Sequence, residues 1–255
     1  MKKTALFTLI PLALLASVTI PVIKWKPDDR SRPKPPVVTP GTESTQAEPG
    51  KAPSDAVVLF DGRDLSEWQG KNGKAAPWHV ADGYFEVTPG SGDIRTKEAF
   101  GDCQLHVEWA SPNPPRGTDQ DRGNSGVYLM SLYEIQVLDS YHADTYPDGQ
   151  AGAVYSQWPP LVNPIRPPGM WQMYDIVFHG PRFSASGELE RLATVTVLFN
   201  GVLVQDHVSL TGPTAWEGRP PYKKHAEKMP LLLQDHHHPV RFRNIWIREL
   251  HEPES

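Results

Sequence analysis

One stretch decides the fold class: residues 194–204 read Thr-Val-Thr-Val-Leu-Phe-Asn-Gly-Val-Leu-Val. β-Branched and aromatic residues dominate both sides of the Asn-Gly pair, and such residues favour strands. Asn-Gly between two runs of this kind is the strongest short-range signal for a two-residue β-hairpin turn, because both residues tolerate a positive φ. The stretch therefore predicts two antiparallel strands joined by a tight turn.

Similar short runs, separated by turn residues, recur along the chain. Asp82-Gly83 separates the apolar runs at 78–80 and 84–87 and predicts a second hairpin. Further strands are expected at residues 57–60, 104–109, 125–132, 133–138, 174–178 and 240–248. No window of a dozen residues shows a convincing helical period. These observations predict an all-β antiparallel sandwich or barrel.

The composition narrows the class of protein. The 255 residues include 27 prolines, about double the usual share of ~5%, and 20 glycines, so the chain is rich in turns and loops. The 25 Lys and Arg against 30 Asp and Glu give a net charge of −5, which is not the basic footprint of a nucleic-acid binder. The single cysteine, Cys103, excludes a disulfide within one chain and a cysteine-based metal site.

The N-terminus has the pattern of an export signal. Lys2 and Lys3 precede an almost wholly apolar run at residues 5–23, which is also nearly long enough to cross a bilayer. We expect residues 1–23 to be a signal peptide or a membrane anchor, and the protein to be exported: periplasmic, at the outer surface or anchored through residues 5–23. Residues 24–55 are expected to be a Pro-rich disordered linker before a folded domain at 56–251.

The most informative segment is Tyr133-Glu134-Ile135-Gln136-Val137-Leu138-Asp139-Ser140. Glu134 and Gln136 are two residues apart and share one face of a strand. A bulge after Gln136 would bring Asp139 to the same face, and bulges recur beside active sites. The pattern resembles the catalytic strand of laminarinase-like jelly-roll glycosidases, in which an aspartate replaces Gln136. The alternative is the outward polar face of an ordinary strand.

Neighbouring segments supply candidates for sugar binding. Asn124 and Ser125 come before the strand that contains Glu134 and could bind sugar hydroxyls, or form a simple turn. Tyr and Trp side chains in the following loops suit stacking on the apolar faces of sugars. The substrate-binding candidates are Arg95, Lys97, Asn124, Ser125, Tyr128, Gln136, Tyr146, Gln157, Trp158 and Gln234.

Two charged clusters have both a functional and a structural interpretation. Imidazole and carboxylate are standard metal ligands, so the cluster at residues 234–238, with His236 and His238 as an i, i+2 strand pair, is a candidate site for a divalent metal; a solvated turn is the alternative. Arg95 and Lys97 have the spacing of one strand face and could hold a negative intermediate, or form a plain surface pair.

Eight motifs together resemble the 3-keto-disaccharide hydrolase domain family over about residues 56–250. They are Leu59-Phe60-Asp61-Gly62, Gly92-Asp93-Ile94, Phe100-Gly101-Asp102, Asn124-Ser125-Gly126, residues 133–140, Tyr146-Pro147-Asp148-Gly149-Gln150, Leu233-Gln234-Asp235-His236 and Phe242-Arg243-Asn244-Ile245. The resemblance implies a concanavalin-like jelly roll in an exported bacterial protein that cleaves 3-keto-glycosides, in some members with a divalent metal. His237 departs from the glycine usual after the Asp-His pair.

The resemblance implies a small-molecule carbohydrate substrate and a catalytic set of Glu134, Asp139 and His236. A C3 ketone acidifies the C2 proton, so the site needs a base, an enolate stabiliser and an acid for the leaving oxygen. Glu134 is expected to be the base or a metal ligand; His236, Arg95 or a metal stabilises the enolate. Asp139 assists the leaving group, and Gln136 and Gln157 orient hydroxyls.

Three other functions use the same residues differently. A carbohydrate-binding module needs the aromatic side chains but no ionisable cluster. A retaining glycosidase would use Glu134 and Asp139 as nucleophile and acid, with their carboxyls ~5–5.5 Å apart. An adhesion domain on a stalk suits the Pro-rich segment but not the polar strand at 133–140.

Overall fold

The computed structural model describes residues 24–251. They divide into one folded unit, Val37–His251, and a separate segment at residues 24–36. The predicted leader at residues 1–23 lies outside the described residues, so export and anchoring stay predictions. Among the described residues, no helix is both long and apolar enough to cross a membrane.

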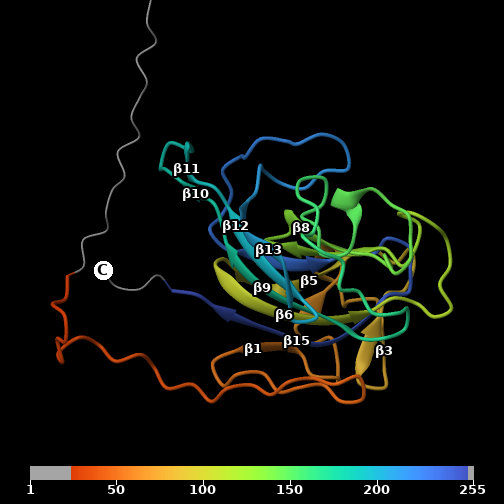
Figure 1. Cartoon of the computed structure of the whole chain (residues 1–255), viewed down its shortest axis with the longest axis horizontal. Helices are drawn as coiled ribbons and strands as arrows, with labels where there is room; N and C mark the ends of the chain where they lie inside the picture. Colours follow the sequence, from red (N-terminus) through yellow and green to blue (C-terminus); the bar gives the residue numbers. More distant parts are fainter. Residues whose placement is uncertain (1–23, 252–255) are drawn as a thin grey trace, which may run out of the picture. The chain divides into compact units, whose positions relative to one another are not determined.

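The folded unit is an all-β structure made of two large antiparallel sheets (Figure 1). Its described helical elements are two single turns of 3₁₀ helix, η1 (Lys71–Gly73) and η2 (Pro147–Gly149). The larger sheet has eight strands in the order β13-β12-β9-β6-β15-β4-β3, with β1 paired to β15. These strands are β1 (Val57–Phe60), β3 (His79–Ala81), β4 (Tyr84–Glu86), β6 (Cys103–Ala110), β9 (Gln172–His179), β12 (Thr194–Phe199), β13 (Val202–Ser209) and β15 (Arg241–Glu249).

The smaller sheet carries the polar strand singled out in the sequence. Its order is β2-β5-β14-β7-β8, so β8 lies at an edge. The five strands are β2 (Trp68–Gln69), β5 (Ile94–Phe100), β7 (Ser125–Leu129), β8 (Tyr133–Val137) and β14 (Met229–Leu233). A separate pair is formed by β10 (Arg182–Phe183) and β11 (Leu189–Arg191).

The two large sheets enclose one apolar core. Alternate residues of β9 and β12 are buried, which is the period expected of strands with one face on a core. Aromatic rings from the two sheets pack against each other in this core. The ring centroids of Tyr133 (β8) and Phe178 (β9) are 5.7 Å apart, and those of Trp68 (β2) and Phe85 (β4) are 6.0 Å apart. This architecture confirms the all-β prediction and is consistent with a jelly-roll sandwich.

The predicted hairpins form as expected. Asn200 and Gly201 both have positive φ and join β12 to β13, and Asp82-Gly83 joins β3 to β4 in the same way. The sequence pattern did not predict β14, which occupies the centre of the smaller sheet. Pro230 lies inside this strand, and a proline argues against a central strand because it cannot donate a hydrogen bond. Only Leu232 and Leu233 of β14 pair with β7, so Pro230 lies beyond that ladder.

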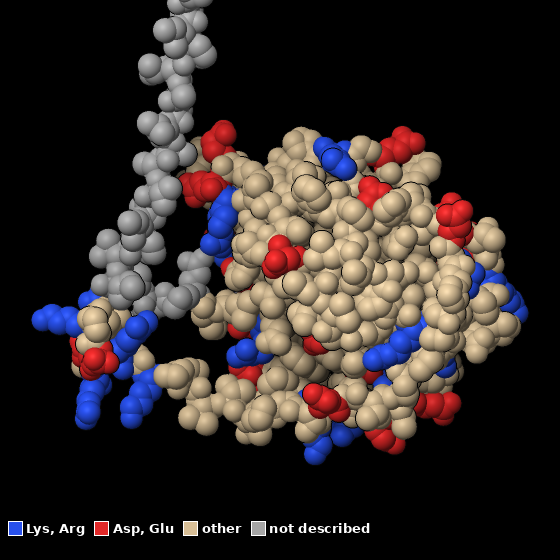
Figure 2. All heavy atoms as spheres, viewed as in Figure 1, with Lys and Arg blue, Asp and Glu red and all other residues tan. Residues whose placement is uncertain are grey.

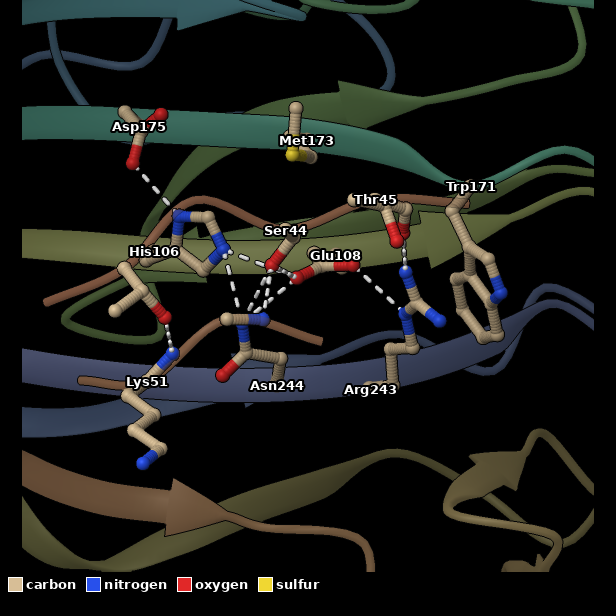
Figure 3. A network of polar contacts seen from close by, with 12 residues as sticks. Ser44, Thr45, Lys51, His106, Glu108, Trp171, Met173, Asp175, Arg243 and Asn244 are labelled. Atoms are coloured by element: carbon tan, nitrogen blue, oxygen red, sulfur yellow. Dashed lines mark hydrogen bonds and ion pairs between the residues drawn. The ribbon is translucent and has the colours of Figure 1, made fainter. Parts of the chain in front are cut away.

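Residues 37–55 differ from the predicted disordered linker, because they belong to the folded unit and lie along the larger sheet. Gln46 exchanges two hydrogen bonds of 2.8 Å with the backbone of Trp171, and Thr45 accepts one from Arg243. Ser44 donates to the carboxylate of Glu108 (Figure 3). The segment has few apolar groups to bury, but the sheet offers buried polar partners that hold it.

Those partners form a charged network beneath the segment (Figure 3). Glu108 is fully buried and accepts from Arg243 Nε and Asn244 Nδ2, each at 2.7 Å, while His106 lies between Glu108 and Asp175. Burial alone would lower the pKa of His106, but its bonds to Asp175 and Glu108 raise it to about 9. The cations and hydroxyl donors around Glu108 outweigh the effect of burial and lower its pKa. Two cations therefore face two carboxylates.

Elsewhere the surface carries charges of both signs. On the face shown in Figure 2, Lys and Arg side chains are interspersed with Asp and Glu over the folded unit. This face therefore carries both positive and negative side chains, as expected from the similar numbers of basic and acidic residues in the sequence.

Removing the Glu108 carboxylate should destabilise the folded unit. In Glu108→Ala the buried Arg243 loses its anionic partner, so we expect the free energy of unfolding to fall by about 3–5 kcal/mol. Urea unfolding followed by tryptophan fluorescence measures the change. The matched control is Glu249→Ala, which breaks the exposed pair with Lys228 and should cost less than about 1 kcal/mol. Equal losses in the two variants would contradict the argument.

Candidate functional site

The register of β7 and β8 places the candidate acid. Tyr128 lies opposite Glu134, and Gly126 lies opposite Gln136, in an unbroken antiparallel ladder. Directly opposed residues share one face of a sheet, so all four positions face away from the core. The hairpin turns through Met130 and Ser131, both with positive φ, and Ser131 Oγ is tied to the Pro230 carbonyl at 2.7 Å. The neighbouring central strand thus holds the turn.

These residues open onto a hollow of about 600 Å³, which we call the Glu134 pocket. It gathers seven of the predicted site residues from β7, β8 and the segments beside them. The pocket is lined by Asp119, Gln120, Asn124, Tyr128, Glu134, Gln136, Tyr146, Tyr155, Thr214, Ala215, Trp216, Gln234 and His236.

Glu134 is almost completely buried at the base of this pocket. A methyl group at Gly126 would lie 2.5 Å from Glu134 Oε1, so the absence of a side chain there makes room for the carboxyl group. Burial raises the pKa of Glu134 to about 8, and a hydrogen bond from the Tyr128 hydroxyl offsets only part of that rise. Glu134 therefore exchanges its proton near neutral pH, the range in which a general base works best.

Tyr128 and Gln234 hold the carboxyl in place. Gln234 Nε2 donates to the Tyr128 hydroxyl oxygen at 3.2 Å, and that hydroxyl donates to Glu134. Burial and the nearby Glu134 both raise the pKa of Tyr128, so the phenol keeps its proton. A chain of donors thus runs from Gln234 through Tyr128 to the buried carboxyl.

Two amide oxygens in the pocket have no hydrogen-bond partner. Gln136 donates from Nε2 to Gln120 and to the Gly149 carbonyl, which leaves its buried Oε1 unpaired. Gln234 Oε1 is buried and unpaired in the same way. An unmade hydrogen bond of this kind costs about 1–3 kcal/mol. Both residues line the pocket, so these amide groups lie next to any ligand that occupies it.

Aromatic side chains form the mouth of the pocket. The Trp216 side chain is 82% exposed, and the Tyr146 and Tyr155 hydroxyls contact each other at 2.6 Å. Exposed rings offer faces on which the C–H groups of a sugar can stack. Trp216 was not among the predicted site residues, because a lone tryptophan in a turn-rich stretch is a weak sequence signal.

Asp139 does not lie in the Glu134 pocket, contrary to the predicted catalytic role. β8 is regular and ends at Val137, so the expected bulge after Gln136 does not form. Asp139 is buried instead in an ion pair with Arg122 (Nε to Oδ2, 2.8 Å), and its Oδ1 accepts from the Tyr141 backbone at 3.2 Å. Its carboxylate anchors the turn after the strand.

Several predicted sugar-binding residues also have structural partners. Ser125 Oγ donates to the Gln234 carbonyl, and Trp158 Nε1 donates to the Ser209 carbonyl. Gln157 is buried and bonds Thr211 and the Gly212 carbonyl, which fixes the start of the loop that carries Trp216. These three side chains stabilise segments next to the pocket but do not line it.

Arg95 and Lys97 lie on the same open face of the smaller sheet as Glu134, but on β5. Arg95 lines a separate hollow, so the structure does not bring these cations to the buried carboxyl.

The donors considered for a metal do not converge. His236 lines the Glu134 pocket, whereas His238 lines a different hollow, where its Nε2 lies 3.1 Å from Asp121. Among the described residues, 24–251, no group of three His, Cys, Asp or Glu side chains could hold a metal ion. Structural and catalytic zinc sites use at least three protein ligands. The described residues therefore do not assemble a three-ligand site of the kind that zinc requires, and the divalent metal stays a prediction.

With the geometry established, comparison with known proteins identifies the family. The model of the 3-keto-alpha-glucoside-1,2-lyase-like domain matches residues 55–248, most of the chain. The chain belongs to this family. The family assignment confirms the resemblance seen in the sequence motifs.

Solved structures agree with this assignment. A candidate glycosyl hydrolase of Parabacteroides distasonis ATCC 8503 is 50% identical, with a TM-score of 0.82 over 86% of this chain and 93% of that one. A second candidate glycosyl hydrolase of the same organism is 21% identical, with a TM-score of 0.55 over 77% of this chain and 94% of that one, and shows likeness of fold alone. No curated protein matches the chain.

The Glu134 carboxyl should titrate far above an ordinary glutamate. We expect a pKa of about 8 in the native protein, against a usual 4.5, and a higher value in Tyr128→Phe because the donor to the carboxylate is lost. Carbon-13 NMR of the glutamate carboxyls measures this, with the signal assigned by its loss in Glu134→Gln. A native pKa near 4.5 would show that water solvates the carboxyl, and an unchanged value in Tyr128→Phe would remove Tyr128 as its donor.

Proposed function

We propose that the protein cleaves the glycosidic bond of 3-keto-glycosides by removing the proton at C2. The observation that carries this proposal is the buried Glu134 carboxyl, held by Tyr128 at the base of a pocket with two unpaired amide oxygens, in a member of the 3-keto-alpha-glucoside-1,2-lyase-like family. A base of raised pKa in a polar pocket suits proton abstraction beside a ketone.

The proposed reaction has two parts. The Glu134 carboxylate takes the C2 proton, and the C2–H electrons form the enolate of the C3 ketone. The enolate then re-forms the C3 carbonyl and a C1–C2 double bond as the C1–O bond breaks. The leaving oxygen receives a proton, and addition of water to the unsaturated product gives the 3-keto sugar.

Other pocket residues support each step. When Glu134 gains the proton it no longer needs the Tyr128 hydroxyl, which can then donate to the enolate oxygen. His236 is the second side chain of the pocket able to transfer a proton, and we assign it to the leaving oxygen. Gln136 and Gln234 accept from sugar hydroxyls, and Trp216 provides a stacking surface.

The other functions fit less well. A retaining glycosidase needs a second carboxyl beside Glu134, but Asp139 is paired with Arg122 outside the pocket. A carbohydrate-binding module gains nothing from a buried carboxyl whose ionisation opposes burial. Every protein group in the proposed reaction is a side chain of the Glu134 pocket.

Replacing the proposed base should abolish cleavage. Glu134→Gln keeps the shape of the side chain but cannot take a proton, so we expect kcat for 3-keto-trehalose to fall by about 10²- to 10⁴-fold. The assay follows release of the leaving sugar, with unoxidised trehalose as a second substrate and each reaction repeated with a chelator. Glu98→Gln, which changes an exposed carboxyl on β5, is the matched control.

Three outcomes would count against the proposal. Full activity in Glu134→Gln would remove this residue from the mechanism. Cleavage of unoxidised trehalose at a similar rate would indicate an ordinary glycosidase. Binding of intact 3-keto-trehalose without turnover by the native protein would indicate a binding module.

The rate should also follow the ionisation of Glu134. A general base must be deprotonated, so kcat/KM should rise about tenfold per pH unit below a pKa of about 8 and level off above it. The pH profile of kcat/KM for 3-keto-trehalose measures this. A profile without a rising limb near pH 8 would remove Glu134 as the base.

A further inference from the structure

A single row of side chains crosses the open face of the smaller sheet. Starting from Glu134, the register passes to Tyr128 on β7, then to Leu232 on β14, Arg95 on β5 and Gln69 on β2. Each residue is directly opposite the next, so all five project from the same face. The row therefore continues beyond the Glu134 pocket toward the other edge of the sheet.

A second hollow of about 430 Å³ lies at the far part of this row. We call it the Arg95 pocket; it is lined by Gly70, Lys71, Asn72, Gly92, Asp93, Ile94, Arg95 and Leu232. Leu232 is half-buried, and it lies directly between Arg95 and Tyr128 in the register. The half-buried Leu232 side chain thus separates the two pockets. A ligand in the Glu134 pocket can extend over Leu232 into the second hollow.

The side chains that line the Arg95 pocket include two cations and one carboxyl group. Lys71 and Arg95 line the pocket, and Lys97 follows two residues along the same face of β5. The carboxyl group that lines the pocket belongs to Asp93, and its Oδ1 accepts a hydrogen bond of 2.8 Å from the backbone N–H of Asp235. Within residues 24–251, the exposed Arg95 guanidinium has no side-chain partner.

We propose that the Arg95 pocket binds a carboxylate on the leaving group of the 3-keto-glycoside. This inference rests on the proposed function, and it assigns Arg95 to the leaving group rather than to the reacting enolate. A guanidinium pairs with a carboxylate through two parallel hydrogen bonds, which gives the contact both strength and direction. The preferred substrates are therefore glycosides of acidic sugars or of other organic acids.

The spacing of the strands suits such a substrate. Arg95 and Glu134 are three strand spacings apart, about 14 Å between backbones. Both side chains reach out from the sheet toward the ligand, so the gap between their functional groups matches a sugar ring joined to a leaving group of similar size. If the leaving group lacks a carboxylate, the Arg95 guanidinium stays hydrated and adds nothing to the binding of the substrate.

The test compares two 3-keto-glucosides that differ only in the charge of the leaving group. These are 3-keto-maltobionate, whose open-chain leaving group ends in a carboxylate, and 3-keto-maltitol, whose leaving group ends in a hydroxymethyl. We expect kcat/KM to be about tenfold higher for the acid in the native full-length protein. In Arg95→Ala the ratio of the two values should fall to about one, and 0.5 M NaCl should also reduce it in the native protein.

The matched control is Arg116→Ala, which removes an arginine from the separate hollow that contains His238. We expect this variant to keep the tenfold ratio. A ratio lost in Arg116→Ala but kept in Arg95→Ala would place the anion site in that other hollow and overturn the proposal. A ratio of one in the native protein would overturn it too while leaving the proposed function intact. The proposed function itself fails only if the native protein cleaves neither these two substrates nor 3-keto-trehalose.

Discussion

The site depends on the hydrogen-bonded register between β7 and β8. Pairing Tyr128 with Glu134 sets the hydroxyl beside the carboxyl and puts both on the open face of the sheet. Side chains alternate between faces, so a slip of one residue would turn Glu134 into the apolar core and bring Ile135 outward. The tie between Ser131 and the Pro230 carbonyl opposes such a slip, because it fixes the hairpin turn to the neighbouring strand.

The pKa values of two buried glutamates are shifted in opposite directions. Glu108 meets Arg243, His106 and two neutral donors, so its pKa is lowered and it stays ionised as a structural anchor. Among the described residues, the Tyr128 hydroxyl is the one group whose hydrogen bond lowers the pKa of Glu134, so burial dominates and that pKa rises to about 8. Both carboxyl groups are buried, so the number of cationic partners decides whether the pKa is lowered or raised. A carboxyl without a cation gives up some stability but keeps a proton that it can exchange near neutral pH, which is what the proposed reaction requires.

Part of this site could be predicted from sequence and part could not. Glu134 and Gln136 share a face because a strand has a period of two, and that prediction needed no tertiary information. Asp139 required an irregularity that no sequence pattern specifies, and the strand ends before it. The Pro-rich composition of residues 24–55 predicted disorder, yet residues 37–55 lie on the sheet because Glu108, Arg243 and Asn244 offer them buried polar partners from distant parts of the chain.

Local sequence specifies the all-β class, the hairpins at Asp82-Gly83 and Asn200-Gly201, and the polar face of β8, since alternation and turn chemistry are local properties. Tertiary structure alone decided which groups that face would meet. β14 comes about a hundred residues after β7, and its insertion between β7 and β5 brings Gln234 to Tyr128 and places Leu232 between the two pockets. The depth of burial that raises the pKa of Glu134 likewise arises only when these distant segments close around it.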